Sequence, residues 1–428
     1  MIIVDTALER RHDEGNPVRV ALVGAGFMGR GIALQIITSV KGMRLVAIAN
    51  RTLSEAERAY REAGVTAVNT VNNVSQLEDA IARDQYAVTD DASLVCQAEN
   101  VEALIEVTGH VEFSAGVVLE AIKNKKHVIL MNAELDATIG PILKVYADRA
   151  GVIFTNADGD QPGVIMNLYR FVRAIGCRPV LAGNMKGLQD VRRTPETQKA
   201  YAEKYHQKPR MVTSFADGTK ISMEMAVVAN ATGFKAGRRG MYGPECSHVN
   251  EAANLFPMDQ VLDGGLVDYV LGAEPAPGVF VIAYNDHPIQ QQYLNYYKMG
   301  QGPLYTFYTP YHLCHLETPL TVARAVLFSD AAITPIAGPV CDVITVAKRD
   351  LEAGEKLDGI GGFTCYGMLE NSVVCRQENL LPMGLSEGCS LKRRVTMDQV
   401  ISYEDVELPA GRLCDKLRAE QDLRFTMS

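Results

Sequence analysis

An apolar run, three glycines and a helical segment follow one another near the start of the chain, and this order constrains the fold more than any other feature. Residues 18–39 read VRVALVGAGFMGRGIALQIITS, in which Gly24, Gly26 and Gly29 form the pattern G-x-G-x-x-G. The first glycine of such a pattern permits a tight turn, the second lets the backbone approach a pyrophosphate, and the third allows close helix–strand packing. A second apolar run, MRLVAIAN (43–50), follows at the spacing of a βαβ unit. We therefore expect a dinucleotide site with its phosphates at the helix N-terminus.

The end of the second apolar run indicates which dinucleotide binds. An acidic residue there would accept hydrogen bonds from the ribose of NAD and repel a 2′-phosphate. This chain has Asn50, Arg51 and Thr52 instead, and a cation beside two neutral polar groups suits the 2′-phosphate of NADP. The alternative is that Arg51 only points into solvent. We expect NADPH as the cofactor, with Phe27 and Met28 of the glycine loop also in contact with it.

Strands and helices continue to alternate as far as about Asn156, which predicts a doubly wound parallel sheet, the Rossmann architecture of the α/β class. Ligands of such sheets lie beyond the carboxyl ends of the strands. The residues expected to line the nicotinamide side are therefore Thr108, Gly109, Asn132, Ala133 and Glu134.

At 428 residues the chain is long enough for two or three cores. We expect an N-terminal arm (1–17), the Rossmann domain (18–156), an α+β catalytic domain (157–330) whose last helix packs back on the Rossmann domain, and a small β-rich C-terminal domain (331–428). The last of these is expected because short strands alternate there with Gly- and Asp-rich turns.

Composition excludes several classes of protein. A net charge of −9 offers no basic surface for nucleic acid or an anionic membrane. The nine cysteines show no CxxC pair, so neither a zinc module nor a disulfide framework is indicated. No apolar run reaches the roughly 18 residues of a membrane span, and the start lacks the order of a signal peptide. We expect a cytoplasmic protein, a small-molecule substrate and a homo-oligomer.

Two acidic residues, Asp158 and Asp160, follow the last strand of the expected sheet. Helix capping, which Asp performs commonly, is one interpretation of them. The other is a divalent cation site for Mg²⁺ or Mn²⁺, since Mg²⁺ is often held by one or two carboxylates with substrate oxygens. The sequence leaves both open.

The middle of the chain holds the candidate catalytic residues. Lys186 lies beside a glycine after an expected strand, where an ammonium could polarise a carbonyl group. Asp217, Lys220 and Glu224 surround a turn and the start of a helix, and Lys220 and Glu224 are four apart, which fits either an exposed ion pair or an active-site pair. His312 and His315 are three apart, and a buried structural role is the alternative to a site.

Several segments together resemble a known group of enzymes. GAGFMGRG, MNAELDATIGPILKVYADRAGV, DGDQPG, GLQD, TSFADGTK, YTPYHLCHLETP and LLPMGLSEGCSLKR are similar to the homoserine-dehydrogenase-like oxidoreductases with a C-terminal SAF domain, and within them to the 1-deoxy-D-xylulose 5-phosphate reductoisomerase-like (DRL) enzymes. AKRDLEAGEKL and ISYEDVELP resemble SAF domains in particular. An arginine of the segment 187–193 stands where homoserine dehydrogenases have a catalytic lysine, so homoserine is not the expected substrate.

The resemblance implies an NADPH-dependent conversion of 1-deoxy-D-xylulose 5-phosphate to 2-C-methyl-D-erythritol 4-phosphate, a step of isoprenoid precursor synthesis. Lys186, Lys220 and Asp217 or Glu224 would then supply polarisation and proton transfer, and His312 would help to hold the phosphate. Two alternatives stay open: an NADP-dependent dehydrogenase of a sugar acid or polyol, and a protein that senses NADPH without turnover.

Overall fold

The computed structural model describes residues 3–426, which form two compact units. The first unit contains the chain up to Asp160 together with Leu313–Thr334, and the second contains Gln161–His312 and the chain from Pro335 onward. The finer division into four parts expected from the sequence stays a prediction.

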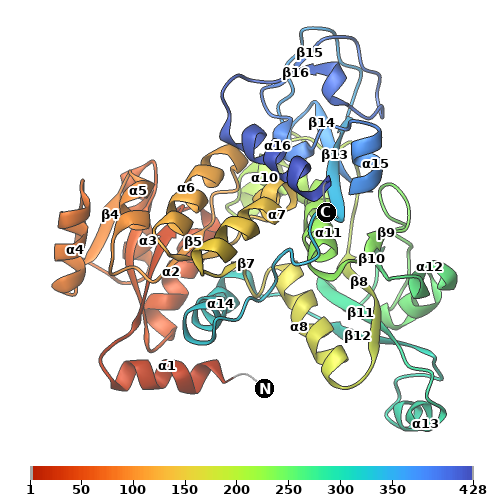
Figure 1. The fold of residues 1–428 in the computed structure, drawn as a ribbon, viewed down its shortest axis with the longest axis horizontal. Helices are drawn as coiled ribbons and strands as arrows, with labels where there is room; N and C mark the ends of the chain where they lie inside the picture. Colours follow the sequence, from red (N-terminus) through yellow and green to blue (C-terminus); the bar gives the residue numbers. More distant parts are fainter. Residues whose placement is uncertain (1–2, 427–428) are drawn as a thin grey trace. The chain divides into compact units, whose positions relative to one another are not determined.

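The first unit is built on a seven-stranded sheet, which lies on the red and orange side of Figure 1. Its strand order is β3-β4-β2-β1-β5-β6-β7, and every neighbouring pair is parallel. Strand order reverses direction at β1, which confirms the doubly wound Rossmann sheet. The strands are β1 (Val18–Val23), β2 (Met43–Ala49), β3 (Val68–Thr70), β4 (Tyr86–Thr89), β5 (Ala103–Glu106), β6 (His127–Leu130) and β7 (Phe154–Asn156).

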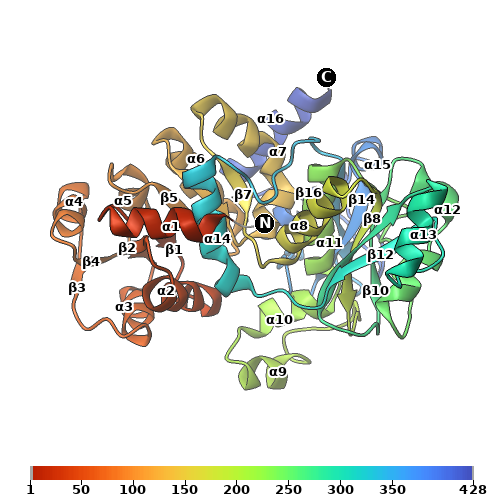
Figure 2. The ribbon, with the colours of Figure 1, turned by 90° about the horizontal axis from the view of Figure 1, so that it is seen from below.

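Helices of the first unit pack on this sheet. They are α1 (Val4–Asp13), α2 (Phe27–Ser39), α3 (Leu53–Glu62), α4 (Val74–Ala82), α5 (Ala92–Gln97), α6 (Val111–Lys123), α7 (Ala133–Ala150) and α14 (Cys314–Phe328). Helix α14 comes from far along the sequence and packs against α2 and the neighbouring strands (Figure 2). Its Val322 and Ala325 belong to the same apolar core as Val20 and Ile32.

The second unit contains a five-stranded mixed sheet in the order β12-β11-β8-β10-β9. Its strands are β8 (Arg178–Lys186), β9 (Lys235–Ala236), β10 (Leu266–Leu271), β11 (Gly278–Tyr284) and β12 (Leu304–Thr309). Helices α8 (Gln161–Ala174) and α11 (Thr219–Thr232) pack against it. The remaining helices of this part are α9 (Lys199–Lys204), α10 (Pro209–Ala216), the 3₁₀ helix η1 (Val249–Asn254), α12 (Met258–Leu262) and α13 (Pro288–Tyr296).

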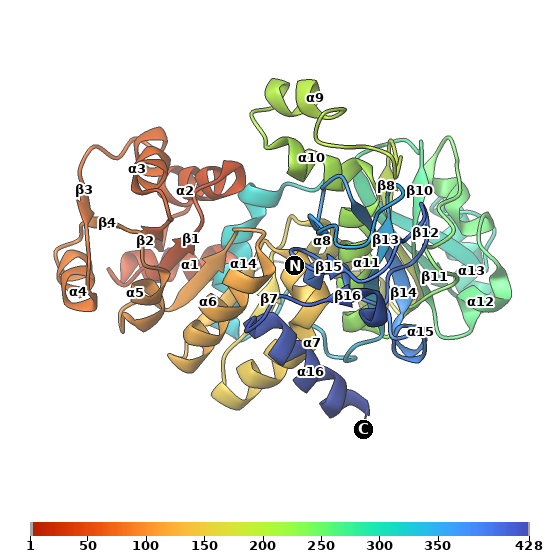
Figure 3. The ribbon, with the colours of Figure 1, turned by 90° about the horizontal axis from the view of Figure 1, so that it is seen from above.

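The C-terminal part of the second unit is a small antiparallel β region. It contains the pairs β13 (Cys341–Ala347) with β14 (Cys365–Asn371) and β15 (Ser390–Leu391) with β16 (Val406–Glu407), and the helices α15 (Ser372–Gln377) and α16 (Leu413–Thr426). Helix α11 lies between the five-stranded sheet and the pair β13–β14 (Figure 1), and Figure 3 views this part from the side of the C-terminal β region. It is therefore buried on almost every side, as its apolar sequence requires.

Candidate active site

The glycine loop between β1 and α2 has the geometry of a phosphate cradle. Gly24 has φ +108°, in the left-handed region that favours glycine. A Cβ on Gly29 would lie 2.2 Å from the carbonyl oxygen of Gly24, so only glycine fits this close contact, whereas a Cβ on Gly26 would meet nothing within 4 Å. Gly26 is the N-cap of α2 and offers no side chain to its backbone N–H groups. The open backbone at Gly26 and the helix N-terminus together fit a pyrophosphate.

Asn50 supports this loop from the end of β2. Its Oδ1 accepts a hydrogen bond of 3.0 Å from the backbone N–H of Ala25, and its Nδ2 donates one of 2.8 Å to the carbonyl of Thr52. Both groups of the side-chain amide are therefore engaged within the protein. Arg51 and Thr52 are exposed beside it, at the N-terminus of α3.

Two of the residues expected on the nicotinamide side, Thr108 and Asn132, contact one buried carboxylate that the sequence analysis missed. Glu106, the last residue of β5, accepts a hydrogen bond of 2.9 Å from the N–H of Thr108 and one of 2.7 Å from Nδ2 of Asn132. Asn132 in turn caps α7 by accepting from the N–H of Leu135 at 3.1 Å. Burial raises the pKa of Glu106, and the hydrogen bonds of Thr108 and Asn132 oppose that rise.

The other three nicotinamide-side candidates follow the same strand ends. Gly109, next after Thr108, has φ +72°, so a left-handed turn leads from β5 into α6. Glu134 is buried in the first turn of α7. Ala133 is the first residue of α7, so all five candidates lie in the segments that directly follow β5 and β6.

Of the two acidic residues, Asp158 is not placed as a cation ligand, whereas Asp160 is buried and its Oδ2 has no hydrogen-bond partner among the described residues. Both carboxylate oxygens of Asp158 accept hydrogen bonds of 3.0 Å from Arg324, and Oδ2 also accepts one of 3.1 Å from Thr321. A carboxylate that is ion-paired in this way joins the end of β7 to α14, and it does not fit a metal ligand. Across residues 3–426, no group of three or more His, Cys, Asp or Glu side chains is placed to hold a metal ion.

In the second unit, a polar cluster occupies the buried face of β8 at its carboxyl end. Asn184 and Lys186 are two apart on the strand and so point to the same face. There Asn184 Nδ2 donates to Glu224 Oε2 of α11 at 2.8 Å and to Gln161 Oε1 of α8 at 3.0 Å. Lys186 Nζ donates to Gln161 Oε1 at 3.1 Å and lies 3.6 Å from Glu224 Oε2. An ammonium group and a carboxylate are thus held together within an otherwise apolar layer.

This cluster contains two of the predicted catalytic residues, Lys186 and Glu224, and Lys220 lies half-buried one turn earlier on α11. Asp217 lies elsewhere: it is fully buried and its Oδ2 accepts a hydrogen bond of 2.9 Å from Lys348 Nζ. Burial raises the pKa of Asp217 and the Lys348 ammonium opposes that rise. This geometry favours a structural role for Asp217 over the catalytic role expected from the sequence.

The two histidines of the predicted pair belong to different units. His312 is half-buried in the segment after β12, at the end of the second unit's first stretch. His315 lies on α14 in the first unit, so close to Gly31 of α2 that a Cβ there would lie 2.9 Å from its ring. Burial lowers the pKa of His315. The structure thus favours the packing role for His315.

Asn184 and Gln161 are functional candidates that the sequence analysis did not single out. Asn184 carried a signal, because an amide in the middle of the apolar strand PVLAGNMK, in register with Lys186, needs a buried polar partner. Gln161 carried no such signal in the sequence, since glutamine is common at the start of a helix.

Comparison with known families assigns these two regions separately. Residues 24–152 match the family model described as the NAD-binding domain of homoserine dehydrogenase, and residues 159–318 match that of the catalytic domain of oxidoreductase DRL. A homoserine dehydrogenase of Corynebacterium glutamicum is 30% identical over 140 residues, which are 32% of this chain and 28% of that enzyme. The chain therefore matches less than a third of that relative's length.

Two solved dehydrogenase structures are similar to this chain over much of its length. Apo scyllo-inositol dehydrogenase from Lactobacillus casei has 12% identity and a TM-score of 0.43, covering 74% of this chain and 89% of that one. A probable dehydrogenase from Thermotoga maritima has 11% identity and a TM-score of 0.42, covering 73% and 90%. At these scores the neighbours do not identify a substrate.

No helix within residues 3–426 combines the length and the apolar character that crossing a membrane requires. The two family matches agree in pointing to oxidoreductases. The chain thus combines a region similar to the NAD-binding domain of homoserine dehydrogenase with a region similar to the catalytic domain of oxidoreductase DRL.

Proposed function

We propose that the protein is an NADPH-dependent reductoisomerase that converts 1-deoxy-D-xylulose 5-phosphate to 2-C-methyl-D-erythritol 4-phosphate. The observation that carries this proposal is the cluster of Lys186, Glu224, Asn184 and Gln161, which lies inside the segment matched by the DRL catalytic model. The resemblance of the sequence to DRL enzymes supplies the substrate.

The reaction has two chemical demands. The ketose must first rearrange to a branched aldehyde, which requires a hydroxyl to lose a proton and a carbonyl oxygen to gain hydrogen-bond donation. The aldehyde must then be reduced to an alcohol, which consumes one hydride and one proton. NADPH, when bound, would supply the hydride.

The cluster can meet the first demand with groups of this chain. The Lys186 ammonium has three hydrogens, of which one is committed to Gln161, so it can donate to a carbonyl oxygen of the substrate. Glu224 is the carboxylate placed to accept a hydroxyl proton. Asn184 and Gln161 fix the positions of both groups, because each of their amides contacts two members of the cluster. His312 is proposed to contribute to phosphate binding.

NADPH rather than NADH is proposed from the end of β2. Asn50 is neutral and engaged with the glycine loop, so no carboxylate there would repel a 2′-phosphate. The exposed Arg51 and the N-terminus of α3, which has no side-chain cap, would provide a cation and backbone N–H groups.

The test is oxidation of NADPH by the purified protein with 1-deoxy-D-xylulose 5-phosphate, followed by identification of the product. The assay is run with and without Mg²⁺ or Mn²⁺, because the sequence leaves open whether a divalent cation takes part, whereas Asp158 does not fit one. Formation of the branched alcohol phosphate would establish the proposal. NADPH oxidation with a sugar acid or polyol oxidation product, and none with the ketose phosphate, would replace it by the dehydrogenase alternative.

A further inference from the structure

Helix α13 carries an apolar stripe that faces solvent. Its residues Ile289, Tyr293 and Tyr296, continued by Tyr297, are spaced i, i+4, i+7 and i+8 and so form one stripe along the helix. Their exposed fractions are 51%, 58%, 75% and 67%, and no residue of α13 is buried. A contiguous apolar stripe turned to solvent is typical of a protein interface.

The opposite side of α13 attaches the helix to its own unit. Gln291 and Leu294 are half-buried there, and Gln291 Nε2 donates a hydrogen bond of 3.0 Å to the carbonyl of Asn285. The attachment therefore uses the less aromatic side, and it leaves the tyrosines free to contact another molecule.

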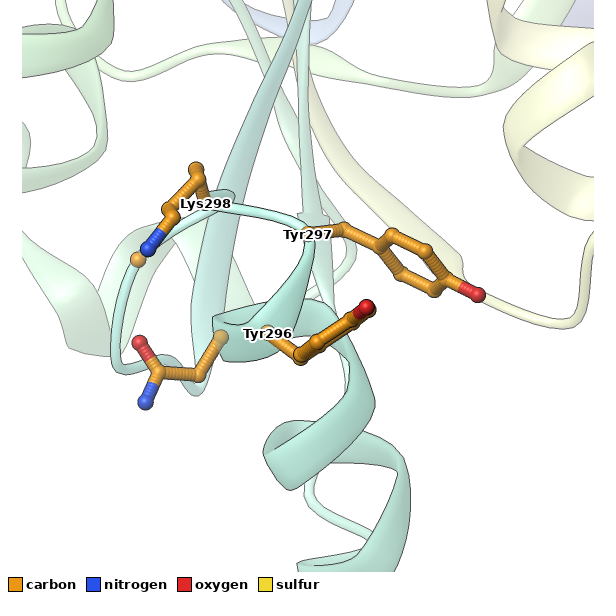
Figure 4. Close-up of a pocket in the computed structure, with 5 residues that line it drawn as sticks. Tyr296, Tyr297 and Lys298 are labelled. Carbon is orange, nitrogen blue, oxygen red and sulfur yellow. The ribbon is translucent and has the colours of Figure 1, made fainter.

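A surface hollow lies at the C-terminal end of the stripe (Figure 4). It has a volume of about 810 Å³ and is lined by Asn295, Tyr296, Tyr297, Lys298 and Gly300. The rings of Tyr296 and Tyr297 are 5.2 Å apart, with an angle of 71° between their planes. Such an arrangement offers aromatic walls for an apolar side chain, and tyrosine is among the residues that dominate binding energy at interfaces.

The charges around α13 indicate the partner. The helix itself carries no charged side chain, but Asp286 lies just before it and Lys298 just after it. When two copies of such a helix pack antiparallel about a two-fold axis, Asp286 of each copy lies near Lys298 of the other, and the helix dipoles oppose favourably. The midpoint between residues 286 and 298 is beside Tyr293, which would therefore meet its own counterpart at the axis.

We propose that α13 is a self-association surface, and that its partner is α13 of a second copy of this chain, packed antiparallel. In this pairing Ile289 of one copy faces the hollow formed by Tyr296 and Tyr297 of the other. A contact of one helix with one helix is smaller than a standard stable interface, so α13 alone predicts a weak, concentration-dependent association. The proposal is independent of the catalytic one.

The first experiment measures the mass of the full-length protein by sedimentation velocity over a wide concentration range. We expect the wild type to associate, and Tyr293→Lys to weaken the association at least about 10-fold, because it places two ammonium groups together at the axis. Tyr201→Lys is the matched control, since Tyr201 is also exposed, at 56%, but lies on α9. A wild type that is monomeric at all concentrations would overturn the proposal, as would an association that Tyr293→Lys leaves unchanged.

A charge exchange tests the antiparallel geometry. Asp286→Lys and Lys298→Asp should each weaken the association, and the double variant should restore it, since it exchanges the two charges across the axis. Oxidative cross-linking gives a second readout, which reports which residues meet: Tyr293→Cys should form a covalent dimer and Tyr201→Cys should not. Failure of the double variant to recover, or equal cross-linking of both cysteine variants, would contradict the pairing.

Discussion

At the scale of single residues, the candidate site consists of one cation and one carboxylate that two amides hold in place. Lys186 and Glu224 are 3.6 Å apart, and Asn184 donates to Glu224 from within the same strand. In a buried setting such groups act strongly on a charge that develops on a substrate oxygen.

We expect Lys186→Met to lower kcat with 1-deoxy-D-xylulose 5-phosphate by about 100-fold or more, as removal of a key transition-state donor does. NADPH affinity, measured by fluorescence titration, should stay within about twofold, because Lys186 is not in the glycine-loop unit. Lys199→Met is the control, since Lys199 is exposed on α9. A near-normal kcat in the Lys186 variant would remove this residue from the mechanism.

Arg51 carries the prediction of cofactor choice. Arg51→Ala should weaken NADPH binding by about 10- to 100-fold, the value of one hydrogen bond to a charged group, and leave NADH binding nearly unchanged. Arg58→Ala on α3 is the matched control, because its guanidinium pairs with Glu55 and Glu62. Equal losses for both dinucleotides, measured as dissociation constants, would contradict a 2′-phosphate contact.

At the scale of elements, the sequence predicted those features whose causes are local. The glycine loop follows from G-x-G-x-x-G between a strand and a helix. Lys186 is indicated by its place beside a glycine after an expected strand, and Glu224 by its spacing of four from Lys220. The hydrogen bonds that join them depend on α8, β8 and α11 meeting, which no local pattern encodes. For the same reason the sequence does not reveal the structural role of Asp217, since its partner Lys348 is 131 residues away.

Helix α7 provides a prediction of pH dependence. Asp136 in its first turn is fully buried beside Asn156, whose Nδ2 donates to it, and burial raises the pKa of Asp136 to about 7. The folded protein thus keeps a proton that the unfolded chain loses near pH 4, so this residue's contribution to stability falls as pH rises from about 4 to 7.

Asp136→Asn is neutral at every pH, so its stability relative to the wild type should increase between pH 5 and pH 8. The difference in the free energy of unfolding between the two proteins should change by roughly 1–4 kcal/mol over this range. The measurement is urea unfolding of both proteins at pH 5 and pH 8. A difference that stays constant with pH, or that changes in the opposite direction, would show that Asp136 is ionised in the folded state over this range.

At the scale of the whole molecule, a buried ion pair in the second unit connects the C-terminal β region to the catalytic region. Lys348, next after β13, donates to Asp217 at 2.9 Å and to the carbonyls of Arg193 and Gly362, at 2.8 and 2.9 Å. Beside it, β14 packs on α11, where the N–H of Gly367 donates to Thr219 Oγ1 at 2.8 Å. The helix that carries Glu224 is therefore held from both sides.

Lys348→Met should destabilise the protein by about 3–5 kcal/mol, because it leaves the Asp217 carboxylate buried without its cation. Adding Asp217→Asn should recover a large part of that loss, since the remaining pair is neutral. Urea unfolding of the wild type, both single variants and the double variant gives the coupling energy directly. If the four stabilities are additive, the pair is not coupled. A different outcome is that the single variants keep the stability of the wild type but lose kcat, and that the double variant does not regain kcat. Asp217 would then act on the substrate, as the sequence predicted.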